Sequence, residues 1–371
     1  MPVRYKGSRG GLKMANKNQK PAKKLRKAIV IRLRILYNKK EPDIPGKAAT
    51  AACPSIIHHL KSFDKGKIPI RRCFFRKKAK HMGSFPRKGQ NMYQILEKRE
   101  LNPTVTLMKI HAPAVAKKAN PGQFIILRTD AEGERIPLTV ADYDRAAGSV
   151  TIIFQVVGAT TEKLNHLGVG DSLHDFVGPL GKPTNTEGKH RVAVVGGGVG
   201  CAIAYPVAKK FFEQGTEVHT VAGFRTRELV ILEQEFAAVS HKFVRMSDDG
   251  SWGEKGLVTD ALRRLIESGE QYDEVITIGP LPMMKFVCLL TKEFDIPTVA
   301  SMNPIMIDGT GMCGGCRLTV GGKTRFACVD GPEFDGHQID FDEAIARSSV
   351  YKPFERHAYE EACNLFRKEV E

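Results

Sequence analysis

The sequence lacks any hydrophobic run close to the roughly 20 residues that a helix needs to cross a bilayer. Its longest candidate, "KAIVIRLRILY", is interrupted by arginines. Cysteines spaced as in a disulfide framework are also lacking, because three of the eight cysteines cluster in one stretch of the chain. These absences argue against a membrane-spanning protein and against a secreted, disulfide-bonded one. We therefore expect a soluble, cytoplasmic protein in a reducing compartment.

Acidic residues are scarce in the first part of the chain. Residues 1–91 carry 26 Lys+Arg against 3 Asp+Glu, a net charge of +23, whereas residues 92–371 carry 31 against 38, a net charge of −7. The overall charge of +16 therefore comes from one segment. It could be a nucleic-acid-binding arm, a transit peptide, which its sparse serine fits poorly, or a disordered extension or over-long start before Met92. We favour the last interpretation and do not expect nucleic acid as a partner.

From Met92 the chain changes to short stretches rich in β-branched residues, separated by Gly, Pro and Asn. They are "TVTLMKIHA", "GQFIILRT", "RIPLTVADY" and "SVTIIFQVVG". Several short strands at this spacing predict an antiparallel β-barrel, which we place at residues 92–187.

Two stretches of the predicted barrel contain residues that suit a phosphate-bearing cofactor. Arg135 and Thr139 are four residues apart, so on a strand they project from the same face. A guanidinium can bind a phosphate through two hydrogen bonds, and a hydroxyl can reach a ring heteroatom. Gly158 precedes two threonines and a helix-like stretch, where backbone N–H groups favour phosphate. Taken alone, each match is better explained by the simpler interpretation, a surface arginine for the first and an ordinary turn for the second.

Residues 188–300 predict an α/β nucleotide-binding domain. In "HRVAVVGGGVGCAIAYPVAKKFFEQG" a buried strand at 192–195 leads through glycines into a helix from about Cys201 to Gln214. "EVHTVAGF" follows as the next strand, which completes a βαβ unit. Gly196, Gly198 and the neighbouring Gly200 would let the backbone approach a pyrophosphate. Cys201 stands where the last glycine of the dinucleotide motif is usual, and we expect it to pack the helix.

The loop after the second strand of this domain, "GFRTRELV", bears on the choice of nucleotide. An NAD site of this type usually has an acidic residue there, whereas arginine can meet the 2′-phosphate of NADP. Here Arg225 and Arg227 precede Glu228. Arginine could also contact the pyrophosphate, so the loop leans only slightly to NADP(H).

The stretch "DGTGMCGGCRLTVGGKTRFAC" contains Cys313, Cys316 and Cys328 at spacings typical of metal ligands. Thiolates suit both zinc and iron–sulfur clusters. A redox dithiol or a hairpin turn would leave Cys328 unexplained. The spacing alone does not identify a fourth ligand.

The order of these segments resembles the ferredoxin–NADP reductase superfamily. Within it the chain resembles the electron-transfer subunit of dihydroorotate dehydrogenase, whose cluster loop follows the pattern C-x4-C-x2-C…C. It resembles still more closely the small subunit of NADH-dependent reduced ferredoxin:NADP oxidoreductase, through "MNPIMIDGTGMCGGCRLTV" and "FACVDGPEFDGHQIDFDE". The resemblance covers roughly residues 92–350 and leaves residues 1–91 without a counterpart.

The resemblance implies a fold and a set of site residues. We expect an FAD-binding antiparallel β-barrel at 92–187, a Rossmann-like NAD(P)-binding α/β domain at 188–300, a [2Fe–2S] loop domain at 301–345 and a C-terminal helical tail at 346–371. The implied metal ligands are Asp308, in place of the first cysteine, with Cys313, Cys316 and Cys328. The implied cofactor-binding residues are Arg135, Pro137, Leu138, Thr139, Gly158, Thr161, Gly178, Gly196, Gly198, Gly200, Arg225, Gly279, Pro280 and Met283.

The resemblance further implies an NAD(P)H-linked flavin oxidoreductase subunit, with electrons passing between a [2Fe–2S] cluster, FAD and NAD(H). NADP(H) is the alternative nucleotide. The implied partner is a larger subunit, similar to the small subunit of glutamate synthase, with a second flavin, [4Fe–4S] clusters and an NADPH site. The two subunits would form an electron-bifurcating complex that ferredoxin serves. No side chain is expected to act as an acid or base. The alternatives are the dihydroorotate dehydrogenase electron-transfer subunit and, in another class, a zinc-stabilised module with a nucleic-acid-binding arm.

Overall fold

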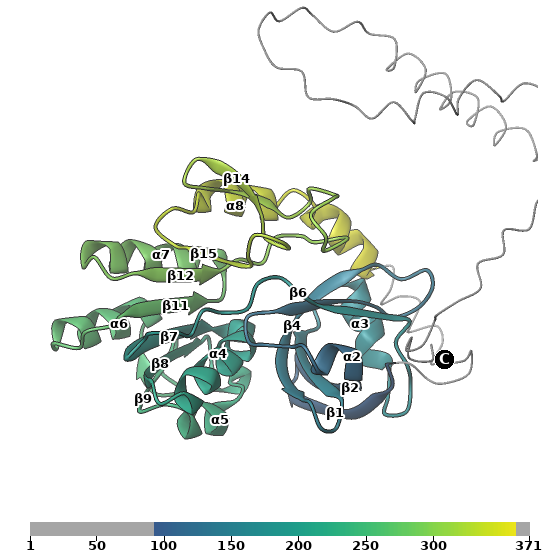
Figure 1. Ribbon diagram of the computed structural model, residues 1–371, viewed down its shortest axis with the longest axis horizontal. Coiled ribbons are helices and arrows are strands. Elements are labelled where there is room, and N and C mark those ends of the chain that lie inside the picture. The colour runs from purple at the N-terminus through teal and green to yellow at the C-terminus, as the bar shows by residue number, and fades with distance from the viewer. Residues whose placement is uncertain (1–92, 361–371) are drawn as a thin grey trace, which may run out of the picture. The chain divides into compact units, whose positions relative to one another are not determined.

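The computed structural model describes residues 93–360. The basic segment 1–91 and the last part of the predicted tail, 361–371, lie outside the described residues. Three parts follow one another along the described chain: an antiparallel barrel, a mostly parallel sheet covered by helices, and a small hairpin region with a helix (Figure 1).

Six antiparallel strands form the barrel, in the order β1-β2-β5-β4-β3-β6. The sheet closes where the start of β1 meets the segment before β6: the Ile95 amide donates to the Asp171 carbonyl at 2.8 Å, and the Leu173 amide to the Tyr93 carbonyl at 3.1 Å. Two short helices, α2 (Pro113–Ala116) and α3 (Ala159–His166), complete this part. The strands are β1 (Ile95–Asn102), β2 (Val105–His111), β3 (Phe124–Arg128), β4 (Ile136–Asp144), β5 (Ser149–Gln155) and β6 (Asp175–Leu180).

Alternation along the barrel strands divides their apolar residues between two cores, because successive side chains in a strand point to opposite faces. Met108 and Ile110 of β2 lie inside the barrel. Val105 and Leu107 of the same strand pack with the residues of the neighbouring parallel sheet. The barrel and the sheet therefore share a continuous hydrophobic contact.

The second sheet has the strand order β10-β9-β8-β7-β11-β12-β15, and it is parallel except for β15. Parallel strands are joined through the helices α4 (Cys201–Glu213), α5 (Glu233–Ala238), α6 (Val258–Glu267) and α7 (Leu281–Glu293). Short 3₁₀ turns lie at η2 (Gly198–Gly200) and η3 (Arg227–Leu229). The strands are β7 (Arg191–Gly197), β8 (Glu217–Phe224), β9 (Lys242–Ser247), β10 (Glu254–Lys255), β11 (Glu274–Ile278), β12 (Thr298–Ser301) and β15 (Glu333–Asp335).

Both faces of this sheet are buried, which explains the unbroken apolar run of β7. Val192 and Val194 face the core that contains α4 and α5. Ala193 and Val195 face the core that contains α6 and α7. Such a run without alternation is typical of parallel strands with helices on both sides.

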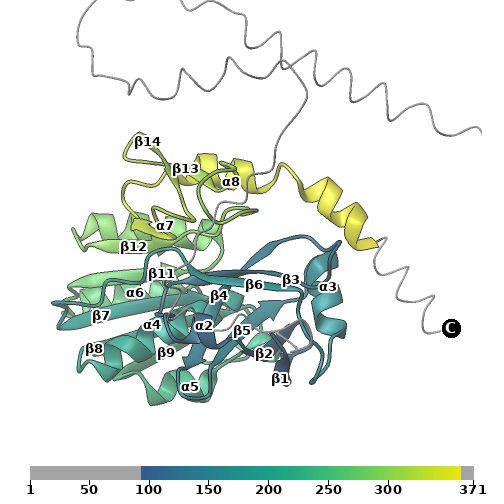
Figure 2. The ribbon, with the colours of Figure 1, turned by 45° about the vertical axis from the view of Figure 1, so that its right-hand side comes forward.

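The hairpin region lies against the edge of the parallel sheet. It consists of β13 (Arg317–Val320), β14 (Lys323–Phe326) and α8 (Phe341–Ser348), and α8 packs against α7 and β13 (Figure 2). Between β14 and α8 the chain returns to the sheet as β15, which pairs antiparallel with β12. Residues 352–360 are helical.

The predicted fold class is confirmed: a barrel, a Rossmann-like domain and a cluster-loop region follow one another in the predicted order. The helix expected to end at Gln214 ends at Glu213, and Gln214 is its C-cap. No helix within residues 93–360 is long and apolar enough to span a membrane. The predicted domain boundaries stay predictions.

Candidate functional site

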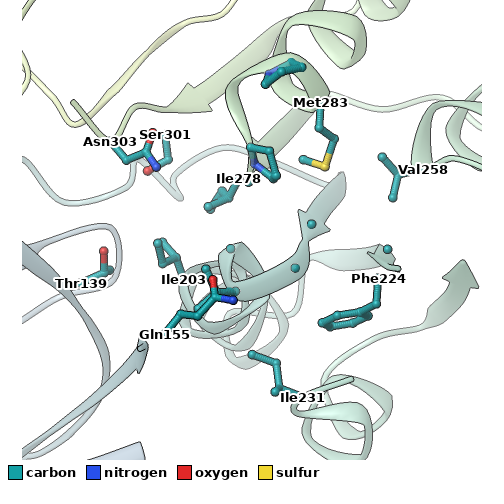
Figure 3. A pocket seen from close by; sticks show the side chains of 18 of the residues that line it. Thr139, Gln155, Ile203, Phe224, Ile231, Val258, Ile278, Met283, Ser301 and Asn303 are labelled. Carbon is teal, nitrogen blue, oxygen red and sulfur yellow. The ribbon is translucent and has the colours of Figure 1, made fainter. Parts of the chain in front are cut away.

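A cleft of about 1260 Å³ lies where the barrel meets the parallel sheet. Figure 3 shows Thr139 and Gln155 of the barrel, Phe224 and Met283 of the sheet domain, and Asn303 from the segment that follows β12. The cleft therefore opens at the carboxyl edge of the parallel strands, which is the edge where α/β sheets bind nucleotides. Of the predicted cofactor-binding residues, those that line it are Pro137, Leu138, Thr139, Thr161, Gly198, Gly200, Arg225, Gly279, Pro280 and Met283.

The glycine turn between β7 and α4 forms one wall of the cleft, and packing leaves no room for a side chain at Gly200. A Cβ on Gly200 would lie 2.6 Å from the carbonyl oxygen of Ile278, which is backbone and cannot move aside cheaply. Gly198 has a φ of +55°, in the left-handed region that favours glycine. The turn thus holds its backbone amides against the cleft at the N-terminus of α4, the arrangement that favours phosphate.

Gly196 is buried behind the turn and is not among the cleft residues. A Cβ there would lie 2.9 Å from the sulfur of Cys201. Cys201 is fully buried, and burial raises the pKa of its thiol to about 12. A neutral, enclosed thiol of this kind acts as a small packing residue, as the sequence predicted for the position of the last glycine.

The turn after β11 meets the glycine turn across the cleft. Gly279 and Pro280 line the wall, and Met283 of α7 points into the same space (Figure 3). A Cβ on Gly197 would lie 2.3 Å from the Met283 sulfur, so the thioether packs directly on the glycine backbone. The neighbouring Ile278 lies buried at the end of β11.

The predicted flavin-binding stretch lies partly in the cleft. Pro137, Leu138 and Thr139 belong to β4 and line it, whereas Arg135 precedes the strand, is exposed and is not among the lining residues. Gly178 belongs to β6 and also lies outside the lining. The part of this stretch that belongs to β4 therefore lines the cleft, and Arg135 lies outside it.

The turn at Gly158 begins helix α3 and is held by one hydroxyl. Thr161 Oγ1 accepts hydrogen bonds from the amides of Val157 and Gly158, each at 3.0 Å, and donates to the Gly158 carbonyl at 2.9 Å. Thr160 donates to Glu134 at 3.1 Å, which ties this turn to the segment before β4. The two predicted flavin stretches, distant in sequence, are thus neighbours, although Gly158 itself does not line the cleft.

Several cleft residues carry no sequence signal. Gln155 ends β5, Ser301 ends β12, and Asp248 follows β9; all three line the cleft. Asn303 also lines it, and it belongs to the "MNPIMID" stretch that carries the family resemblance. Asp248 begins the stretch "DDGSWGEKGLVTDAL", which also resembles the reductases. A neighbourhood of strand ends from two sheets is a tertiary property, so Gln155 and Ser301 could not be found by motif.

The cysteine loop has two buried thiols and one exposed thiol. Cys316 and Cys328 are 1% and 2% exposed, and their sulfur atoms are 3.3 Å apart. Burial, followed by the neighbouring Cys316, raises the pKa of Cys328 to about 12. Cys313 is exposed, and its sulfur accepts from the Gly315 amide at 3.4 Å. A metal must therefore displace the Cys328 proton to bind there.

Asp308 organises the backbone of the same loop. Its Oδ1 accepts from the Thr310 amide and its Oδ2 from the Cys313 amide, both at 2.8 Å. These backbone hydrogen bonds, that of Thr310 first, lower the pKa of the carboxyl, although burial opposes them. Asp308 thus lies next to Cys313 and holds the turn as a cap. This contact suits a turn-capping aspartate and also leaves the carboxylate beside an exposed thiol.

The four predicted metal ligands therefore form two pairs, Cys316 with Cys328 and Asp308 with Cys313. Within residues 93–360 no group of three or more His, Cys, Asp or Glu side chains is gathered closely enough for a single metal ion. Two thiolates on one tetrahedral metal lie about 3.8 Å apart, close to the separation of the buried pair. A two-iron cluster takes two protein ligands on each iron, so the donor set fits that cluster better than a single zinc.

Family models match two segments of the chain. Residues 303–340 match the iron-sulfur cluster binding domain of dihydroorotate dehydrogenase B, and residues 194–289 match the oxidoreductase NAD-binding domain. The first match spans all four predicted metal ligands. The second spans the glycine turn and the turn after β11.

This chain aligns with almost the whole length of several individual relatives. An uncharacterised protein in the adh 3′ region of Clostridium beijerinckii is 49% identical, over 70% of this chain and 91% of the relative. A Thermotoga maritima homologue of the dihydroorotate dehydrogenase B (NAD(+)) electron transfer subunit is 45% identical, over 73% and 96%. A chain from a structure of the NADH-dependent reduced ferredoxin-NADP oxidoreductase is 44% identical, over 74% and 98%, with a TM-score of 0.70.

Proposed function

Because this chain belongs to the family of dihydroorotate dehydrogenase B electron-transfer subunits and their homologues, we propose that it passes electrons between a [2Fe–2S] cluster, FAD and NAD(H). It acts as the flavin- and cluster-bearing subunit of an oxidoreductase of the ferredoxin–NADP reductase type. The domain models for cluster binding and NAD binding support this function.

The observation that carries the proposal is a core shared by the cleft and the cysteine loop. Phe124, Met302 and Met306 line the cleft, and they belong to the same buried cluster of side chains as Cys316 and Cys328. A Cβ on Gly309, next to Asp308, would lie 2.6 Å from Ile126 of β3, so the loop packs directly on the barrel. A cluster in the loop would thus lie next to the flavin domain, with side chains and no wide water layer between them.

The residues of the cleft have separate tasks in this scheme. The flavin is required because nicotinamide exchanges two electrons as a hydride and an iron–sulfur cluster exchanges one. Thr139 and Gln155 of the barrel line the cleft and would offer polar groups to a flavin ring, and the turns at Gly200 and Gly279 would hold the nucleotide from the sheet side. No titratable side chain is needed in the hydride exchange. The role of the chain is thus to position the flavin and the nucleotide and to exclude water from between them.

We further propose a larger partner subunit with a second flavin and [4Fe–4S] clusters. The basis is the similarity to the structure of the NADH-dependent reduced ferredoxin-NADP oxidoreductase, a protein studied for flavin-based electron bifurcation. The electron transfer subunit of dihydroorotate dehydrogenase B is the second candidate. Subunits of that name from Fusobacterium nucleatum and Geobacillus thermodenitrificans are each 30% identical, which is less than the 44% of the first candidate. The iron–sulfur match argues against the zinc-binding alternative.

Cofactor analysis of the full-length protein, purified without oxygen, tests the function. We expect about two irons and one FAD per chain, a visible spectrum with flavin and iron–sulfur bands, and bleaching of the flavin by NADH. A colourless protein with one zinc and no flavin would contradict the proposal. Co-purification with a partner that carries a flavin and iron–sulfur clusters would separate the bifurcating complex from a dihydroorotate dehydrogenase, whose catalytic partner oxidises dihydroorotate.

A further inference from the structure

Two arginines from different elements donate hydrogen bonds to neighbouring carbonyls of the cysteine loop. Arg317 is the first residue of β13, and its Nη1 donates to the Gly314 carbonyl at 3.3 Å. Arg347 lies in the last turn of α8, which packs against β13, and its Nη2 donates to the Gly315 carbonyl at 3.2 Å. These two glycines are the whole segment between two of the predicted ligands. Both of its carbonyls are therefore held by guanidinium groups.

Holding these carbonyls on one side of the turn directs the amides to the other side, because the C=O and N–H of a planar trans peptide point in opposite directions. The Gly315 amide shares a peptide group with the Gly314 carbonyl, and it donates to the Cys313 sulfur at 3.4 Å. The Cys316 amide shares its peptide group with the Gly315 carbonyl, and it has no hydrogen-bond partner within residues 93–360. It is therefore free to donate to a sulfur atom of a bound cluster.

The two guanidinium groups also bring positive charge to the loop. Neither Arg317 nor Arg347 forms an ion pair in the described part of the chain, whereas the neighbouring Lys285 of α7 is paired with Asp342 of α8 at 2.6 Å. A cluster held by three thiolates and a carboxylate is an anion, and reduction makes it more negative. An unpaired cation beside it therefore favours the reduced form. Arg347 is half-buried and Arg317 exposed, so solvent screens the charge of Arg347 less.

We propose that Arg317 and Arg347 are positioning residues that raise the reduction potential of the iron–sulfur cluster. They hold the two glycine carbonyls, so that the amides on the other side of the turn can donate to sulfur. Hydrogen bonds to the sulfur atoms and nearby charge are two of the factors that set the potential of such clusters. A guanidinium bound to a carbonyl also polarises the amide of the same peptide group, which strengthens its hydrogen bond. This inference rests on the proposed function.

The test uses the full-length protein with its cofactors, purified without oxygen, and four variants. Arg347→Gln and Arg317→Gln remove one charge each, and Arg347→Lys keeps the charge and a donor. Arg325→Gln is the matched control, because Arg325 belongs to β14 of the same hairpin and has no hydrogen bond to the turn within residues 93–360. Redox titration followed by electron paramagnetic resonance gives the midpoint potential of the cluster. Iron and FAD analysis shows whether each variant retains its cofactors.

The largest shift is expected for Arg347→Gln. Its midpoint potential should fall by an amount equal to a tenfold change in the ratio of reduced to oxidised cluster, which is about 59 mV for a one-electron couple. Arg317→Gln should lower the potential less, because its charge is more exposed to solvent. Arg347→Lys should lie close to wild type, and Arg325→Gln should change the potential least. Iron and FAD contents should be those of wild type in all four variants.

Equal potentials in wild type, Arg347→Gln and Arg317→Gln would overturn the inference while leaving the electron-transfer function intact, because the arginines would then only brace the loop. The same conclusion would follow from equal shifts in Arg347→Gln and Arg325→Gln, since contact with the turn would then make no difference. If Arg347→Gln loses its iron, the potential of Arg317→Gln decides between the two results. Wild-type protein without an iron–sulfur cluster would contradict the proposed function and this inference with it.

Discussion

The cleft and the cysteine loop are suited to different kinds of ligand, and each uses a different part of the chain. The cleft is built from backbone turns at Gly200 and Gly279 and from strand ends that come from both sheets. The loop instead carries its four candidate ligands on side chains within residues 308–328. A nucleotide is long and must be matched by a surface, whereas a metal needs a few donors at short range. A substitution that disrupts one of the two sites should therefore leave the other intact.

The two predicted ligand pairs of the loop differ in burial, because one pair is buried and the other is not. Cys316 and Cys328 lie in the core that reaches the cleft, whereas Cys313 is exposed and Asp308 half-buried. The buried pair depends on the fold around it. The outer pair depends on the hydrogen bonds of the turn and tolerates more change.

The largest effect is expected for Cys328→Ser. It removes a buried thiol that we propose as a cluster ligand, so the cluster should be lost, while the barrel and the glycine turn are untouched and FAD should remain. Iron content and the flavin spectrum measure both. Cys288→Ala is the matched control, since Cys288 is buried in the same core but lies outside the loop. Loss of FAD together with iron in Cys328→Ser would show that the two sites depend on each other.

Gly200→Ala tests the converse case. The new Cβ would lie 2.6 Å from the Ile278 carbonyl, so the turn must move away from β11. Overpacking of this kind costs about 1–3 kcal/mol, and the displaced amides should slow flavin reduction by NADH at least tenfold. Iron content should be normal. Unchanged kinetics would mean that the turn does not hold the nucleotide.

Substitution of Asp308 separates a ligand from a turn cap. If the carboxylate binds iron, Asp308→Cys should keep a [2Fe–2S] cluster with a shifted reduction potential, because the ligand set changes. Asp308→Ala should make the cluster labile, since one iron then has an open position. Electron paramagnetic resonance of the reduced cluster and redox titration measure both. An unchanged spectrum and potential in Asp308→Cys would leave Asp308 as a cap for Thr310 and Cys313.

A smaller, pH-dependent effect is expected at Glu333, where the hairpin region meets the barrel. Thr184 Oγ1 donates to its carboxylate at 2.7 Å. Burial raises the pKa of Glu333 from 4.5 to about 7, against the lowering effect of that hydrogen bond. The folded state thus prefers the protonated acid, and this stabilisation, complete below pH 4.5, is lost as the pH rises to about 7.

Glu333→Gln should remove this dependence, because the amide keeps an acceptor for Thr184 and cannot ionise. The variant should be more stable than wild type at pH 8 and similar to it at pH 4.5. Thermal midpoints across that range are the measurement. Asp335→Asn is the control, because it removes a nearby carboxylate that is exposed. Parallel curves for wild type and Glu333→Gln would contradict the raised pKa.

The smallest effect is expected from removing residues 1–91. The segment carries the +23 charge but none of the predicted cofactor-binding residues. A chain that begins at Met92 should bind FAD and iron normally and reduce artificial electron acceptors with NADH at the wild-type rate. A missing cofactor in that shortened chain would contradict this expectation.

Much of the architecture was predictable because its signals are local. The apolar run before the glycines predicts a strand buried on both faces, and β7 has that environment. The glycine turn follows from the backbone geometry that a strand-to-helix connection needs. The spacing of Cys313, Cys316 and Cys328 indicates metal ligands for the same reason, since a loop of this length can bring its own side chains together. The predicted family and fold class are confirmed, while the individual site residues stay predictions.

The sequence by itself therefore determined the order of the folding units, the glycine turn and the cysteine spacing, each of which depends on residues close together in the chain. Only the tertiary structure placed Arg135 outside the cleft, brought Asp248 beside Arg225 and packed Glu333 against Thr184. The last two relations join residues 23 and 149 positions apart. Their contacts arise from strand register and from packing between domains, and no local pattern of residue types encodes either one.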